Sequence, residues 1–81
     1  MGLEMLKSSR KTIGTKQTMK AVEKGIVSCV FVAVDAEKRV VLPLMELCSI
    51  KGIPIEEVDS MRVLGDACEI DVGTASAAIL L

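Results

Sequence analysis

The sequence predicts an α/β protein, a three-layer α/β/α sandwich with a small mixed four-stranded sheet. Segments with helical periodicity alternate with strand-like apolar runs over short connections, which is typical of a sheet between helical layers. The 81 residues are 51% hydrophobic, which suits one compact domain over residues 1–81. No repeat, linker or low-complexity segment divides the chain.

The N-terminal part of the chain is expected to form two helices and two strands. Residues 2–9 predict a short helix, and residues 12–13 predict a brief strand. The run 13–25, IGTKQTMKAVEKG, predicts a second helix that ends at Gly25. The run 27–34, VSCVFVAV, is almost continuously apolar, as expected of a central strand buried on both faces. The apolar helix residues expected to face inward are Leu3, Met5, Leu6, Met19, Val22 and Ile26.

A third helix is expected after a polar turn at 35–38. It covers residues 40–52, with Pro43 in its first turn and Gly52 at its end. Its residues expected to face the core are Leu44, Leu47 and Cys48.

The last elements are predicted to be a strand, a helix and a buried strand: 53–58, 61–70 and 75–81. Pro54 lacks a backbone N–H, so the first of these strands should lie near a sheet edge. Asp59 and Ser60 are the candidate N-caps of the helix.

The composition argues against catalysis. The sequence has no histidine, so it cannot form a Ser-His-Asp or Cys-His arrangement. Cys29, Cys48 and Cys68 form no CxxC pair and lie among apolar neighbours, as small buried hydrophobes do in a reducing compartment. We expect no catalytic residue, metal, cofactor or small-molecule substrate. A cysteine-dependent enzyme stays a third hypothesis, which rapid labelling of the thiols in the folded protein would support.

The apolar runs are too short for a membrane. None reaches the roughly 18 residues of a spanning helix, and the N-terminal MGLEMLKSSRK lacks the apolar core of a signal peptide. We therefore expect a cytoplasmic, monomeric protein without a membrane partner.

Charge is distributed unevenly along the chain. Residues 1–25 carry six basic and two acidic side chains, whereas residues 26–81 carry four and nine. Within the 13–25 helix, one face holds Lys16, Gln17, Lys20 and Lys24. Lys16 lies near the N-terminus, where the helix dipole is already positive, and free N–H groups add to an anion site suited to phosphate. The alternative is a solvated helix face without a ligand.

The shortage of aromatic residues limits the kind of phosphate-bearing partner. Phe31 is the only aromatic residue, and it lies in the strand predicted to be buried. Proteins that bind single strands by stacking use exposed aromatic platforms, so that class is disfavoured. A structured nucleic acid fits better, and the Gln17 amide could contact base edges.

Two separated motifs resemble those of the kink-turn RNA-binding ribosomal proteins, the L-seven-Ae family. The first is Gly14-Thr15-Lys16-Gln17-Thr18-x-Lys20, whose Lys-Gln form resembles the small bacterial YbxF-type branch. The second is Val58-x-Ser60-Met61-Arg62-x-Leu64-Gly65-x-Ala67, followed by Ile70-x-Val72-Gly73 and an alanine-rich final strand. Their order and their spread over nearly the whole chain make the resemblance specific.

The resemblance implies non-catalytic binding of an RNA bend, a bulge beside sheared G·A pairs, in a ribosomal or riboswitch RNA. It implies that Gly14 permits close approach, that Lys16 and Gln17 meet guanine edges, and that Lys20 meets phosphate. An exposed loop over 58–62 would cover unstacked bases. The RNA-binding residues so implied are Gly14, Thr15, Lys16, Gln17, Lys20, Lys24, Val58, Ser60, Met61 and Arg62.

A competing hypothesis is a protein-interaction module on the same fold that does not bind RNA. Asp66 stands where relatives in the family carry a lysine, and Glu69 replaces a glycine expected at a helix end. Both add negative charge near the second motif. Without RNA, Val58 would simply close a strand and Ser60 would cap a helix.

Overall fold

The computed structural model describes residues 2–81, and Met1, the first residue of the predicted domain, lies outside this range. The chain alternates between helices and strands, as expected. In chain order, the elements are η1 (Leu3–Leu6, a 3-10 helix), β1 (Lys11–Ile13), α1 (Thr15–Lys24), β2 (Val27–Ala33), α2 (Lys38–Lys51), β3 (Ile55–Val58), α3 (Met61–Ala67) and β4 (Ser76–Leu80).

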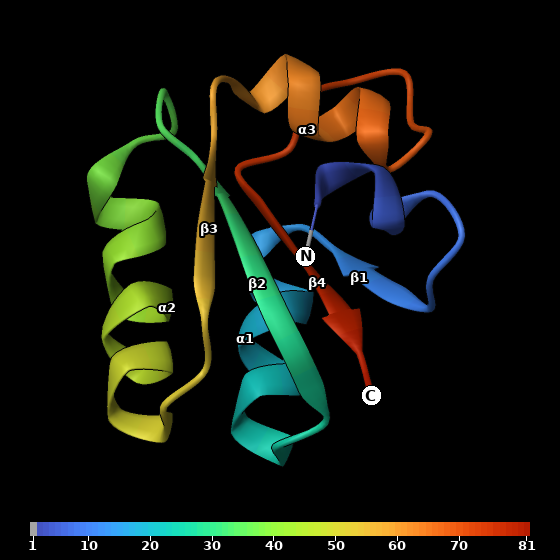
Figure 1. Ribbon diagram of the computed structural model, residues 1–81. Helices are drawn as coiled ribbons and strands as arrows, with labels where there is room; N and C mark the ends of the chain where they lie inside the picture. The colour runs from blue at the N-terminus through green and yellow to red at the C-terminus, as the bar shows by residue number, and fades with distance from the viewer. Residues whose placement is uncertain (1) are drawn as a thin grey trace.

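The strands form one four-stranded sheet in the order β1-β4-β2-β3 (Figure 1). β4 is antiparallel to both of its neighbours, whereas β2 and β3 are parallel, which confirms the mixed sheet. The predicted edge position of β3 is also confirmed. Helices α1 and α2 pack side by side in one layer, and α3 packs with η1 in the other, which confirms the α/β/α sandwich.

The core lies on both sides of β2 and β4. Val30 and Phe31, on opposite faces of β2, are fully buried, so this strand is covered by both helical layers. Ala77 and Ala78 of β4 are also fully buried, and their small side chains let the helices approach the sheet. The largest fully buried side chains from the helices are Leu6, Leu44 and Leu64.

All three α-helices end in the same turn. A residue with positive φ follows the helix, and the next N–H bonds back to a carbonyl five residues earlier, as in a Schellman motif. Gly25 and Gly52 hold this position after α1 and α2, both with φ 71°. After α3 the position is held by Glu69, with φ 62°, so α3 ends at Ala67 and not at residue 70 as predicted. Glu69 therefore stands in a conformation that favours glycine.

Other details also differ from the sequence prediction. Met5 and Ile26 are exposed, because η1 is only one turn long and Ile26 lies beyond the end of α1. Val34 is also exposed, since β2 ends at Ala33. α2 begins at Lys38 and not at residue 40, so Pro43 lies in the second turn. Because Pro43 has no N–H, it cannot donate the usual hydrogen bond to the carbonyl oxygen four residues earlier.

Candidate nucleic-acid interface

The N-terminus of α1 presents free donors and positive charge. Gly14 precedes the helix with φ 94° and ψ 150°, a conformation open essentially to glycine alone. Within residues 2–81, no side chain caps this helix and its first turn holds no acid. The first N–H groups of a helix have no acceptor inside it, so those of Thr15 and Lys16 remain available to an anion.

The basic face predicted for this helix is exposed. Thr18, Ala21 and Val22 are buried against the core, and the opposite side carries the exposed residues Lys16, Gln17, Lys20 and Lys24. Across residues 2–81, the one ion pair joins Arg39 to Glu37, so no carboxylate neutralises these lysines. Lys24 lies eight residues beyond Lys16, about 12 Å farther along the helix axis.

Ser76, the first residue of β4, positions the start of α1. The Gly14 N–H donates to the Ser76 carbonyl oxygen at 2.9 Å, and the hydroxyls of Thr15 and Ser76 share a hydrogen bond of 2.7 Å. A second hydroxyl pair, Thr12 with Thr18 at 2.9 Å, joins β1 to the first turn of α1. Since the Thr15 hydroxyl bonds to Ser76, we assign Thr15 a positioning role through its side chain.

The second motif forms the N-terminus of α3. The Ser60 side chain accepts a hydrogen bond from the Val63 N–H at 3.1 Å, which confirms Ser60 as the N-cap, whereas Asp59 does not cap the helix. The Met61 N–H donates to an Asp35 carboxylate oxygen at 2.8 Å, which ties the β2–α2 connection to α3. Arg62 is exposed beside these contacts.

The segment before β4 brings the two motifs to one end of the sheet. The Thr74 N–H donates to the Met61 carbonyl oxygen at 3.1 Å, and two residues later Ser76 holds Gly14. Two residues of extended chain span about 7 Å, so the N-termini of α1 and α3 are neighbours. Sequence reasoning missed Asp35, Thr74 and Ser76 as positioning residues. The polar Thr74 and Ser76 beside an apolar strand were the signal that could have found two of them.

The exposed loop predicted over residues 58–62 is wrong. Val58 is the last residue of β3 and only 5% exposed, so it belongs to the core and offers little surface to a ligand. Met61 is the first residue of α3 and packs partly against the core. The turn between the two elements consists only of Asp59 and Ser60. Of the four RNA-binding residues predicted here, Arg62 is exposed, as expected of a ligand contact.

Two glycines of the second motif have packing roles. A Cβ on Gly65 would lie 2.1 Å from the Val72 carbonyl oxygen, so only glycine lets the 68–75 segment cross α3 this closely. A Cβ on Gly73 would lie 3.1 Å from Met61 atoms. The same close packing places Thr74 within reach of Met61.

The three cysteine thiols are in an environment that lowers their reactivity. Cys29, Cys48 and Cys68 are buried and free. Burial raises the pKa of all three thiols, and the nearby Glu56 carboxylate raises that of Cys29 further. Across the described residues, 2–81, no group of three potential ligands is placed to hold a metal ion. In the same range, no helix is long and apolar enough to cross a membrane.

Together, the fold and the uncapped N-terminus of α1 define a small α/β protein with an anion-attracting end. The chain belongs to the ribosomal protein L7Ae/L30e/S12e/Gadd45 family, whose model matches residues 3–80. Membership in this family supports the expectation that the protein is not an enzyme.

Relatives and solved structures agree with this assignment. An RNA-binding protein of Halalkalibacterium halodurans is 55% identical over 67 residues, 83% of this chain and 82% of that protein. RNA-binding protein YbxF of Geobacillus stearothermophilus is 39% identical over 77 residues, 95% of this chain and 94% of that protein. The solved 15.5kD RNA binding protein of Giardia lamblia has a TM-score of 0.89 at 30% identity and covers 98% of this chain and 70% of its own. These relatives support the assignment of the chain to the YbxF-like branch of the family.

Proposed function

We propose that this protein binds structured RNA without catalysis and prefers a sharp bend of the kink-turn type. One observation carries the proposal: Thr74 and Ser76 hold the N-termini of α3 and α1 at one end of the sheet. The uncapped N-terminus of α1 and its unpaired lysines attract phosphate there. Family membership and the names of the relatives support RNA as the partner.

Four exposed residues of the interface, together with Gly14, have chemically suited roles. Lys20 and Arg62 neutralise backbone phosphates. Lys16 and Gln17, one turn nearer the start of α1, contact guanine edges, for which lysine supplies donors and glutamine supplies both a donor and an acceptor. Gly14 has no side chain and lets the RNA come close to the backbone.

The deciding experiment is a gel-shift titration against three RNAs at fixed salt. The first is a kink-turn, the second is the same RNA with its sheared G·A pairs replaced by Watson–Crick pairs, and the third is a straight duplex of equal length. We expect the tightest binding to the kink-turn. Equal affinity for all three would reduce the interaction to charge attraction.

The same titration tests the alternative of a protein-interaction module. Asp66 and Glu69 are both exposed, and their charge opposes RNA. Absence of binding to any of the three RNAs would favour that alternative. We further propose that the protein acts in the cytoplasm and that it is a monomer. Sedimentation with and without RNA would test the monomeric state.

A further inference from the structure

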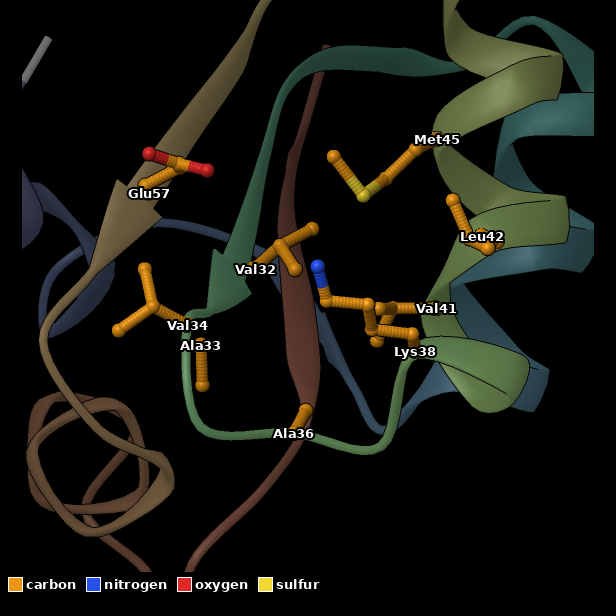
Figure 2. Close-up of a pocket in the computed structure, with 9 residues that line it drawn as sticks. All are labelled: Val32, Ala33, Val34, Ala36, Lys38, Val41, Leu42, Met45 and Glu57. Carbon is orange, nitrogen blue, oxygen red and sulfur yellow. The ribbon is translucent and has the colours of Figure 1, made fainter.

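A cavity of about 270 Å³ lies between β2, β3 and α2 (Figure 2). None of its lining residues belongs to the proposed RNA interface. Figure 2 shows Val32 between Glu57 of β3 on one side and Met45 and Leu42 of α2 on the other. The wall is mostly apolar, and its two charged members are Lys38 and Glu57. Within residues 2–81, these two side chains form no ion pair with each other or with another residue.

The cavity adjoins an unpaired strand edge. In the part of the chain that the structure describes, β3 ends the sheet, with β2 as its one neighbour. The Val30 and Val34 N–H groups donate to the carbonyl oxygens of Pro54 and Val58, at 3.0 and 2.9 Å. Successive residues of a strand direct their backbone groups to opposite sides, so those of Ile55 and Glu57 point to the open edge. Because Glu57 pairs with Val32, its side chain lies on the cavity face.

We propose that β3 accepts an added strand from a partner protein, an extended segment that contains lysine or arginine. The segment bonds to the backbone of Ile55 and Glu57 and places an apolar side chain in the cavity. Strand addition of this kind obtains affinity from backbone hydrogen bonds and specificity from pockets for alternate side chains. This protein has both features side by side: the open edge of β3 and the mostly apolar cavity.

The acidic charge of β3 favours a basic segment of a partner protein over a second copy of this chain. Glu56, Glu57 and Asp59 lie within four consecutive residues, and Glu56 and Glu57 point to opposite faces of the strand. Pairing of two β3 edges would bring like charges together, which is unfavourable and is a common way for proteins to block edge-to-edge association. An alternating basic and apolar segment instead puts its cations beside Glu56 and its apolar residues over the cavity.

The probe for this proposal is a synthetic hexapeptide that alternates lysine with leucine. Its binding to the full chain is measured by calorimetry and by NMR. We expect saturable binding with amide shifts at Ile55 and Glu57 and a methyl shift at Met45. A peptide alternating glutamate with leucine tests charge. The lysine peptide with N-methyl groups on alternate amides tests the strand hydrogen bonds. Neither the glutamate peptide nor the N-methylated peptide should bind.

Matched protein variants locate the contact. Glu56→Lys should weaken binding of the lysine peptide about tenfold or more, since it reverses the charge on the face of β3 that the lysines of the peptide occupy. Glu46→Lys makes the same change on an exposed position of α2 that does not line the cavity, and it should leave binding unchanged. Thermal melts of both variants show whether each is folded.

Four results overturn the proposal. They are no binding of the lysine peptide, equal binding of the N-methylated peptide, equal loss in the two protein variants, and displacement of the peptide by a kink-turn RNA at a salt concentration at which the peptide alone does not bind that RNA. The last would assign the cavity to the RNA interface. RNA binding itself is measured by a separate titration, so either proposal can fail without the other.

Discussion

The hydroxyls of Thr15 and Ser76 lie 2.7 Å apart and join the first residue of α1 to the first residue of β4. Ser76 is fully buried, and its carbonyl oxygen also accepts the Gly14 N–H. One serine therefore holds both the turn before α1 and the first residue of the helix. The proposed RNA contacts at Lys16 and Gln17 follow directly from this anchor.

Ser76→Ala should lower the free energy of unfolding by about 1 kcal/mol, because it removes one hydroxyl pair and leaves the Thr15 hydroxyl without that partner. Thr15→Ser keeps the hydroxyl and is the matched control. Urea unfolding of both variants checks the prediction. If Ser76→Ala were as stable as the parent, the hydroxyl pair would contribute nothing measurable.

The two glycines that flank α1 should respond differently to asparagine. Gly25, at φ 71° and ψ 27°, lies in the left-handed helical region, which asparagine tolerates, so Gly25→Asn should cost little. Gly14, at φ 94° and ψ 150°, lies in a region reserved for glycine, so Gly14→Asn should cost about 1–3 kcal/mol. A Cβ at either position meets no atom within 4 Å, so the difference reports backbone strain alone. Equal losses in urea unfolding would contradict this account.

Glu69→Gly should raise the free energy of unfolding by about 0.5–1 kcal/mol, because glycine relieves the positive φ of 62°. Glu69→Ala removes the same charge but keeps a Cβ, and it should not stabilise the protein. Thermal or urea unfolding separates the two effects. Stabilisation of equal size in both variants would assign the cost to charge and not to the backbone.

Lys20→Ala and Gln17→Ala should separate phosphate contact from base reading. Lys20→Ala should weaken binding to all RNAs and reduce the salt slope of log K by about one. Gln17→Ala should keep the slope but lose about 1–3 kcal/mol of preference for sheared G·A pairs over Watson–Crick substitutes.

Lys51→Ala is the control for this pair, because Lys51 bonds to the Glu23 carbonyl oxygen near the far end of α1. It should change neither the slope nor the preference. Unaltered discrimination in Gln17→Ala would show that the RNA is recognised by shape, with α1 supplying only charge.

Stability should fall as the pH rises above about 8.5, the ordinary pKa of cysteine. Burial raises the pKa of Cys29, Cys48 and Cys68 in the folded state, so these thiols stay protonated while those of the unfolded chain ionise. The unfolded state then binds fewer protons, and each thiol lowers the free energy of unfolding by up to about 1.4 kcal/mol per pH unit.

The measurement is urea unfolding between pH 7.5 and 10. This pH range brackets the ordinary cysteine pKa of about 8.5. Cys68→Ala removes one titrating thiol and should make the loss of stability with pH less steep. A slope identical to that of the parent would show that the Cys68 thiol ionises equally in both states.

Local patterns predicted the elements well because each pattern reports a strong local preference. Val27–Ala33 is apolar on both faces and became a buried strand, and Gly25 and Gly52 ended their helices. The interface was predicted less well, because its geometry depends on contacts between distant residues. Met61 became the half-buried start of a helix through bonds to Asp35 and Thr74, which no local pattern reveals.

Because β4 follows the other strands in the sequence, it determines when β1 and the start of α1 can assemble. Among residues 2–81, β1 pairs only with β4, so residues 11–13 have no strand to join until residues 77–79 exist. Gly14 depends on Ser76 in the same way. α1 is synthesised early, but it is fixed in position only after β4 has left the ribosome. Pairing of β1 with β4 is slow, because the two strands are far apart in the sequence. A chain that stops before residue 76 should therefore not assemble the proposed RNA interface, because Gly14 and β1 lack the partners that hold them.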